Sequence, residues 1–466
     1  MDKRENVLGT DPIGKLLLKY SIPAIIAMMV SALYNVVDRI FIGNIPGVGP
    51  MAIAGLGVTM PVMSIVMAFG TLIGIGAATN ISIKLGEGKK DKAERVLGNA
   101  LTLIIIVGVT LAVVGLVFLD KILLTFGASE GTLQYAKAYL NIILLGTVFS
   151  LMSMAFSNLI RGDGNPKLSA TIMAVGCGTN IILDAVFIFV FGMGIQGAAL
   201  ATVIAQAISS LLGLNYYLKR KSTVQLKKAS LKLDGVVVKM IFAIGMAPFA
   251  MQLTNSLIQV LNNTALKTHG GDLAIGAMAT IMSINMIFVM PAFGFVQAMQ
   301  PIVGYNYGAK KYDRAKKTLI ISLVATTVVF TLGGLVIQLA PEMLVGMFNK
   351  DPELMKLTVN GIKKYALAMP LIGIPIVGTN YIQSIGKAKM AMVLSLLRQV
   401  IVLIPCIMIL PQFLQLDGVW FSQPTADTIA TVITALVLVK EVKRYADHKK
   451  VQTLEIEEEE LEEAAV

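Results

Sequence analysis

The sequence predicts an all-α polytopic membrane protein with twelve transmembrane helices in two related six-helix bundles. Hydrophobic residues make up 56% of the 466 residues and charged residues only 14%, whereas soluble domains are about 25% charged. Apolar stretches of about 20 residues recur along the chain, each long enough to cross a hydrocarbon core of about 30 Å. The chain also repeats itself at a constant spacing. A soluble α/β protein would instead alternate short strands with amphipathic helices.

The spans are the apolar runs between charged breaks. Their expected bounds are 15–42, 52–80, 95–119, 133–160, 167–190, 194–217, 236–263, 273–304, 315–339, 358–384, 389–410 and 420–440. The first runs on past signal-peptide length without a small-residue cleavage site, so it is expected to remain as an anchor.

The charges of the loops predict the orientation. Junctions after even-numbered spans are rich in Lys and Arg, whereas the odd-numbered junctions are cation-poor apart from the loop after span 9. By the positive-inside rule, both termini are expected to face the cytoplasm. The net charge of +11 therefore belongs largely to one membrane face and does not require a nucleic-acid partner.

The internal repeat predicts the domain organisation. LGEGKKDKAER at 85–95 matches YGAKKYDRAKK at 307–317, and SNLIRGDGNPK at 157–167 matches TNYIQSIGKAK at 379–389, both 222 residues apart. Since six spans separate the copies, a pseudo-two-fold axis along the membrane normal should relate them, as in transporters with a substrate site between the halves. The expected units are an N-lobe at 1–218, a basic cytoplasmic linker at 219–235, a C-lobe at 236–442 and a disordered charged tail at 443–466.

Ionisable residues inside the spans are candidates for function. Asp38 and Asp184 lie at matching depth, roughly 7 to 9 Å from the outer ends of spans 1 and 5. Asn180 is one turn before Asp184, and Thr202 and the possible neighbour Tyr139 enter at a similar level. These oxygens suit a small cation, and a buried carboxylate suits a proton. Alternatively, Asp38 pairs with Arg39 or caps a helix end, and the amide and hydroxyl only hold helices together.

The repeat favours a single ion site. Asp184 corresponds to Cys406, Asn180 to Val402 and Asp38 to Asn263, so the second half lacks these carboxylates. A requirement of the scaffold should appear in both halves. Arg398, inside span 11, is interpreted as a structural residue that snorkels or binds carbonyls.

A substrate cavity is expected on spans 7 and 8, where amides and methionines mix. Its candidate residues are Gln252, Asn255, Met282, Asn285 and Met286. Adaptable methionines suit varied amphipathic molecules, although ordinary core packing accounts for them equally well. Pro23 is the expected hinge of span 1. With His269 and His448 far apart and Cys177 and Cys406 in different halves, we expect no enzyme, no cofactor and no metal beyond a possible Na⁺.

Four segments resemble one known family. They are IPAIIAMMVSALYNVVDRIFIG near the start, IRGDGNPK after span 4, NIILDAVFIF with GIQGAALAT, and QPIVGYNYGAKKYDRAKK after span 8. The chain is similar, to about Lys450, to the multidrug and toxic compound extrusion (MATE) family of the bacterial MepA-like type. The resemblance implies two six-helix lobes around a V-shaped cavity and export of cationic or amphipathic molecules in exchange for Na⁺ or H⁺. It also implies a cation site at Asp38, Asn180, Asp184 and Thr202, with Tyr139 nearby.

We therefore expect a monomeric antiporter that lies in the lipid bilayer of a bacterial inner (plasma) membrane and exports small organic substrates. The alternative is a flippase of the same superfamily for a lipid-linked precursor. Such a flippase should place several Arg or Lys residues in the central cavity, whereas the spans here contain Arg398 and otherwise only cations at their edges. A channel fits the repeat and the buried carboxylates less well.

Overall fold

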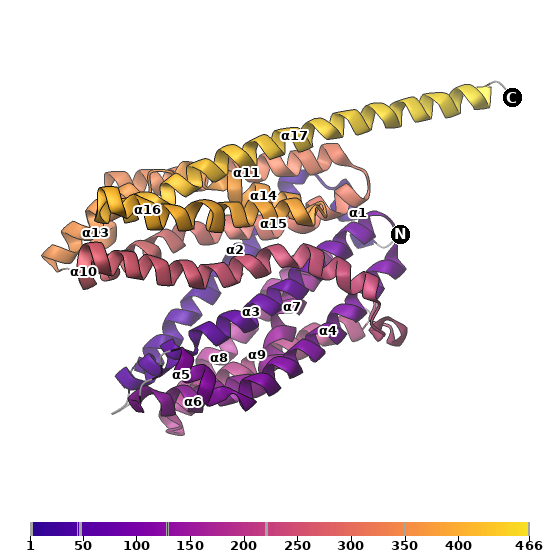
Figure 1. Ribbon diagram of the computed structural model, residues 1–466. Coiled ribbons are helices and arrows are strands. Elements are labelled where there is room, and N and C mark those ends of the chain that lie inside the picture. The colour runs from indigo at the N-terminus through magenta and orange to yellow at the C-terminus, as the bar shows by residue number, and fades with distance from the viewer. Residues whose placement is uncertain are drawn as a thin grey trace.

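The computed structural model describes residues 3–43, 45, 49–126, 128, 130–219, 222–348 and 351–464, all helical or irregular without a strand (Figure 1). The N-terminal part contains α1 (Lys3–Thr10), α2 (Ile13–Gly43), α3 (Gly49–Gly86), α4 (Lys90–Val117), α5 (Leu119–Thr125), α6 (Glu130–Leu145), α7 (Thr147–Gly162), α8 (Pro166–Ala185), the π-helix η1 (Val186–Val190) and α9 (Gly194–Leu218).

The C-terminal part begins in the connection between the halves. It contains the 3₁₀-helix η2 (Lys228–Leu231), α10 (Gly235–Gly308), α11 (Tyr312–Leu339), α12 (Pro341–Gly346), α13 (Pro352–Tyr365), the 3₁₀-helix η3 (Met369–Leu371), α14 (Gly373–Ser384), α15 (Ala388–Leu396), the π-helix η4 (Leu397–Leu403), α16 (Ile404–Leu414) and α17 (Leu416–Ala464).

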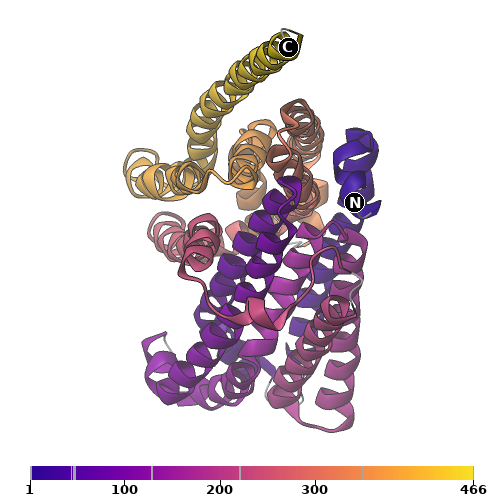
Figure 2. The ribbon, with the colours of Figure 1, turned by 90° about the vertical axis from the view of Figure 1, so that its right-hand side faces the viewer.

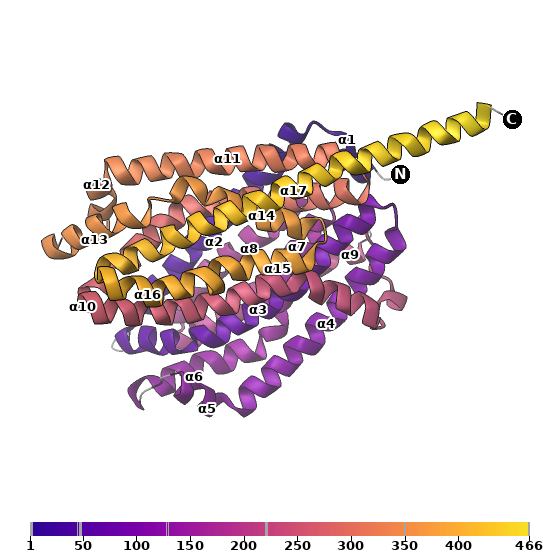
Figure 3. The ribbon, with the colours of Figure 1, turned by 45° about the horizontal axis from the view of Figure 1, so that its top comes forward.

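The two halves form two groups of helices. Figures 1 and 2 show α2 to α9 packed together as one lobe and α10 to α17 as the other, and Figure 3 shows the spans of both lobes running along the length of the molecule. The helices of each lobe are apolar on most faces, as expected where lipid is the solvent. We name the end of the molecule that holds α1 and the connection between α9 and α10 the linker end.

Nine described helices are long and apolar enough to cross a membrane, and two bent pairs raise the number to eleven. α10 supplies two of the nine, because Gly271 breaks it with a φ of 70° that side chains rarely adopt. The twelfth predicted span corresponds to the start of α17, which is richer in hydroxyl and amide groups. Hydropathy alone therefore does not detect this span.

The repeat is visible in the irregularities of the helices. α6 and α7 meet at a bend of 59° around Gly146, and the bent pair of α13 with η3 and α14 meets at 42° around residues 366–368. These breaks lie 222 residues apart, at the spacing of the sequence repeat. Spans 5 and 11 each contain a π-helix. The halves thus share the breaks in their helices as well as the number of spans.

The lobes touch at the linker end through α3 and α10. A Cβ atom at Gly76 would lie 2.2 Å from the carbonyl oxygen of Ile241, and one at Gly245 would lie 1.9 Å from that of Leu72. Real Cβ contacts are not this short, so glycine is required on both sides. The backbones of the two lobes are therefore in direct contact at this end.

The connection between the lobes is bound to the N-lobe. The Asp163 carboxylate accepts hydrogen bonds from the Tyr216 hydroxyl at 2.6 Å and from the Thr223 backbone at 3.1 Å. Lys227 forms an ion pair with Glu94, and this hydrogen bond raises the pKa of Lys227. The linker is thus held along one lobe rather than hanging between the two.

The N-terminal segment is held by the opposite lobe. The Asn306 amide donates to the carbonyl of Leu8 at 2.9 Å, and Lys311 donates to that of Gly9 at 3.0 Å. Arg314 donates to the carbonyl of Asp11 at 2.7 Å. Span 1 is therefore tied to the C-lobe at its linker end, directly before it enters the N-lobe.

α17 continues as a helix through the charged tail to Ala464 (Figure 1). Glu, Leu, Lys and Ala dominate this segment and are good helix formers.

Candidate functional site

The predicted ion-site residues converge inside the N-lobe, where we name Asp38, Asn180, Asp184 and Thr202 the carboxylate site. Their exposed fractions are 9%, 2%, 0% and 4%. Asp184 is in hydrogen-bonding contact with Asp38. With the Asn180 amide oriented to satisfy both neighbours, its nitrogen donates to Asp184 Oδ2 at 2.9 Å and its oxygen lies 3.3 Å from the Thr202 hydroxyl. Three helices, α2, α8 and α9, thus contribute to one cluster.

Local sequence explains why α8 presents two of these side chains together. The turn before it has Gly164 at a φ of 86°, Asn165 caps the first turn by accepting from the Leu168 N–H, and Pro166 occupies the first helical position. Asn180 and Asp184 are then four residues apart on one helical face.

Two tyrosines complete the cluster. Tyr139 is 4% exposed, and both it and Tyr34 interact with the charges of Asp38 and Asp184 and with the Thr202 hydroxyl. Tyr139 was expected here, whereas Tyr34 was missed. The signal was present in the sequence, because Tyr34 is four residues before Asp38 on the same helix.

The helix carrying Asp184 changes its winding directly after the site. η1 begins at Val186, two residues after Asp184. Phe189 in η1 packs edge-on against Phe41 of α2 with ring centroids 5.7 Å apart. π-helical turns are rare and frequent at functional sites. Here the turn presents an aromatic pair that joins the two carboxylate-bearing helices.

A cavity of about 110 Å³ lies beside the site. Its lining residues are Tyr34, Ser153, Met173, Gly176, Cys177, Asn180, Thr202, Ala205, Gln206 and Ser209. A water molecule takes about 30 Å³ of liquid volume, so there is room for a few waters or a hydrated ion next to Asn180 and Thr202.

The donor set fits a small hard cation or a proton. Two carboxylates, an amide oxygen and a hydroxyl are hard ligands. Asp184 Oδ1 is buried and has no hydrogen-bond partner among the described residues, as expected of an atom that binds a ligand. No group of three or more His, Cys, Asp or Glu side chains converges in the described part of the chain.

Asn180 and Thr202 also have the role of holding helices together. Asn180 and Thr202 do join α8 to α9, so they also serve helix packing. The side chain of Arg39 lies outside the described residues, and so does its predicted pairing with Asp38.

The C-lobe holds a different charged pair, which corrects the interpretation of Arg398. The positions equivalent to the site are Cys406, Val402 and Asn263, but the C-lobe also contains the buried carboxylate of Asp427, which is 1% exposed and was missed. Arg398 Nε donates to Asp427 Oδ1 at 2.7 Å. Arg398 therefore pairs with a carboxylate rather than with backbone carbonyls or the membrane surface.

The candidate cavity residues lie on the two arms of α10. Gln252 and Asn285 are half-buried, while Met282 and Met286 are 39% and 53% exposed. Asn255 is exposed and accepts a hydrogen bond from Gln399 at 2.7 Å. These side chains lie apart from the carboxylate site, on the other lobe. The expected hinge residue, Pro23, lies inside α2, where it removes one helical hydrogen bond.

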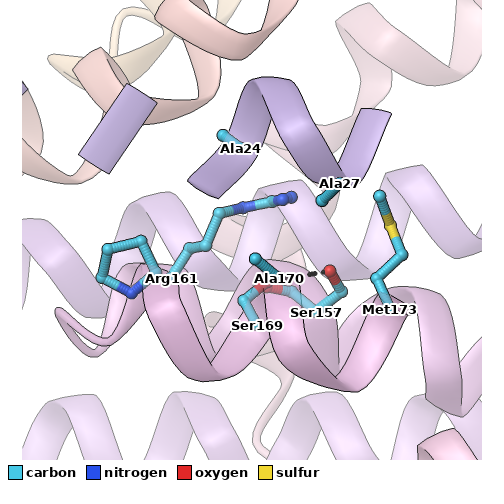
Figure 4. Close-up of a pocket in the computed structure, with 8 residues that line it drawn as sticks. Ala24, Ala27, Ser157, Arg161, Ser169, Ala170 and Met173 are labelled. Atoms are coloured by element: carbon cyan, nitrogen blue, oxygen red, sulfur yellow. Dashed lines mark hydrogen bonds between the residues drawn. The ribbon is translucent and has the colours of Figure 1, made fainter. Parts of the chain in front are cut away.

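A second residue that hydropathy missed is Arg161, which the sequence places at a junction between spans. Its guanidinium extends between α7 and the segment of α2 that carries Ala24 and Ala27 (Figure 4). It donates to Gln297 of the C-lobe at 2.5 Å and to Asn158 at 2.6 Å. Arg161 thus bridges the two lobes.

Two six-span lobes, backbone contact at one end and a polar site buried in one lobe are the architecture of a membrane transporter. The MatE family model matches residues 23–186 and 248–408, most of the chain. The chain belongs to the MATE family.

Individual relatives agree with this assignment. The chain is 28% identical to the multidrug export protein MepA of Staphylococcus haemolyticus (strain JCSC1435), over 96% of this chain and 97% of that protein. It is 40% identical to the solved structure of the MATE multidrug transporter DinF-BH, with a TM-score of 0.87 over 94% of this chain and 98% of the other. An outward-facing MATE transporter shares the fold at 22% identity, with a TM-score of 0.89 over 96% of this chain and 99% of that chain. The predicted fold class and family are confirmed.

Proposed function

We propose that the protein is a multidrug exporter of the plasma membrane that moves cationic or amphipathic organic molecules in exchange for Na⁺ or H⁺ bound at the carboxylate site. The single observation that carries the coupling role is the orphaned Asp184 oxygen beside Asp38, inside a lobe whose repeat-related counterpart has no carboxylates at these positions. The names of the relatives support the export of drugs.

The site binds the ion through this chain's own oxygens. Asp38 and Asp184 supply charge, while Asn180 and Thr202 supply neutral donors that hold the Asp184 carboxylate in place. A bound cation or proton removes the repulsion between the two carboxylates, so occupancy changes the energy of contact between α2 and α8. Pro23 leaves α2 the freedom to bend toward or away from α8.

Alternating access follows from the position of α2. Its linker end is tied to the C-lobe through Leu8, Gly9 and Asp11, and its other half contributes Asp38 to the N-lobe. Bending α2 therefore changes the contact between the lobes, which is how ion binding would select one state over the other. With the linker end cytoplasmic, as the loop charges indicate, the closed contact of α3 with α10 corresponds to a state closed toward the cytoplasm.

The flippase alternative is less favoured. Arg398 is neutralised by Asp427, so the C-lobe does not offer an unpaired cation there for a lipid pyrophosphate.

The test is transport in proteoliposomes with the Na⁺ and pH gradients imposed separately. We expect one gradient to drive uptake of an organic cation such as tetraphenylphosphonium in inverted orientation, and the other to be ineffective or weaker. Equal flux without any gradient would show a channel or a facilitator instead of an antiporter.

A further inference from the structure

The N-lobe contains a second pocket between the carboxylate site and the linker end. It is lined by Ala24, Ala27, Ser157, Arg161, Pro166, Ser169, Ala170 and Met173 (Figure 4). Met173 also lines the larger cavity beside Asn180 and Thr202. The two pockets are therefore adjacent, and we name them together the route.

The route is lined by polar side chains interspersed with apolar ones such as Ala24, Ala27 and Ala170. From the site it passes Gln206, Ser209 and Ser153, and beyond Met173 it passes Ser157 and Ser169 before it reaches Arg161. None of the residues lining either pocket beyond the site is a carboxylate. Hydroxyl and amide groups suit the passage of a small cation without holding it.

The route is closed at Arg161. The cavity near the site has room for water, whereas the pocket at Arg161 leaves no space for a water-sized sphere. The obstruction carries a positive charge.

That charge is uncompensated. Both hydrogen-bond partners of the guanidinium, Gln297 and Asn158, are neutral, and no ion pair of Arg161 with a carboxylate occurs among the described residues. Arg398, which is likewise half-buried, does have its carboxylate. Arg161 is half-buried, and withdrawing a cation from water without a counter-charge is costly, which points to a role that needs the charge itself.

The repeat shows that the helix junction at Arg161 does not need a positive charge in order to fold. Asn158 donates to the carbonyl of Met154 at 2.9 Å, and its repeat equivalent, Asn380, donates to that of Ile376 at 2.8 Å. The position equivalent to Arg161 is occupied by Gln383, a neutral amide. The same helix junction therefore folds in the C-lobe without a cation.

We propose that Arg161 gates the route by which the coupling cation leaves the carboxylate site toward the linker end. This rests on the proposed function. While the lobes touch at that end, Gln297 holds the guanidinium across the route, and its charge repels a monovalent cation or a proton, as arginines do in selective pores. When the lobes separate, the bond to Gln297 is lost and the side chain is free to move aside.

The test measures ion leak in proteoliposomes without organic substrate, as radioactive Na⁺ uptake and as collapse of an imposed pH gradient. Arg161→Gln, which copies the C-lobe residue, should raise the leak of the coupling ion at least tenfold and lower the substrate exported per ion. Arg161→Lys keeps the charge and should remain sealed. Lys167→Gln removes an exposed cation at the same end of the N-lobe and should behave as the wild type.

Two outcomes would overturn the proposal: a folded Arg161→Gln variant as tight as the wild type, or an Arg161→Lys variant that leaks equally. If Arg161→Gln does not fold, Gln297→Ala is the deciding variant, because it frees the Arg161 guanidinium from the C-lobe. The Gln297→Ala protein should leak more ions than the wild type. A leak no greater than that of the wild type would contradict the gate. Failure of the proposed function is distinct, since wild-type protein would then show no gradient-driven export.

Discussion

Gly86 and Gly308 are equivalent positions of the repeat, and each packs against the backbone of the opposite lobe. A Cβ at Gly86 would lie 2.0 Å from the carbonyl oxygen of Tyr305, and one at Gly308 would lie 2.2 Å from that of Ile83. Ile83 and Tyr305 are themselves 222 residues apart. The pseudo-two-fold axis therefore passes through this contact, which closes the linker end.

Gly308→Ala should favour separation of the lobes at the linker end, because the added methyl group overlaps backbone that has no room to move. Overpacking of this kind costs about 1 to 3 kcal/mol, enough to change the ratio of the two states by about 5- to 150-fold. Distances between spin labels on the linker ends of α3 and α10 measure the shift. Gly57→Ala is the control, since nothing lies within 4 Å of its added atom, and an unchanged distance distribution in Gly308→Ala would contradict this account of the contact.

Arg398 and Asp427 should behave as a coupled structural pair. Arg398→Gln leaves a buried carboxylate whose remaining donor among the described side chains is the Gln423 amide at 3.2 Å. Losing one partner of a buried ion pair costs about 3 to 5 kcal/mol. The double variant Arg398→Gln/Asp427→Asn should recover most of this stability. Thermal unfolding in detergent checks the cycle, and additive losses from the two substitutions would rule out the coupling.

Asp163 should hold the linker in its ordered conformation against the N-lobe. Asp163→Asn weakens three charge-assisted bonds, to the Tyr216 hydroxyl and to the backbones of Thr223 and Val224, each worth about 1.5 to 3 kcal/mol. Limited proteolysis should then cleave the linker several-fold faster. Asp91→Asn removes only an exposed ion pair with Lys227 of the linker, in which the Asp91 side chain is 91% exposed; such surface pairs contribute little, so the rate should stay close to that of the wild type. Equal cleavage of both variants would count against the anchor.

Glu87 should give a small pH dependence at the linker end. Burial favours its neutral form, but hydrogen bonds and charge from Lys89 and Lys84 outweigh burial and lower the pKa below the ordinary value of 4.5. Its stabilising contribution is thus present above the unfolded-state pKa and lost as the pH falls through the folded-state pKa. The melting temperature of the wild type should exceed that of Glu87→Gln slightly at pH 7, and the two should converge in acid. A difference that grows in acid would reverse the assigned sign.

The carboxylate site was predictable because its signals are local. Asn180 and Asp184 are one turn apart, and their depth along the spans matches that of Asp38 and Thr202. Arg161 was not predictable in this way, since hydropathy places it at a span boundary, and only the packing of α7 against α2 and α10 shows that its side chain turns inward. Asp427 escaped notice because it lies among the Ser, Thr and Gln residues of α17, where a carboxylate does not interrupt a strongly apolar run.

The fold was predictable for a similar reason. Lipid as solvent requires long apolar helices, and these are readable from hydropathy. The bends at Gly146 and near residue 368, and the π-helices after Asp184 and at Arg398, depend on tertiary contacts that periodicity does not contain.

The central claim is that Asp184 binds the coupling ion, and Asp184→Asn tests it most directly. Replacing the carboxylate removes a charged ligand, and ion affinity should fall by about 10- to 150-fold, the equivalent of one charge-assisted bond. Asp120→Asn, at an exposed ion pair with Lys137 in the same lobe, is the matched control. In proteoliposomes with an imposed ion gradient, Asp184→Asn should lose gradient-driven export while Asp120→Asn retains it; undiminished gradient-driven export by Asp184→Asn would contradict the account.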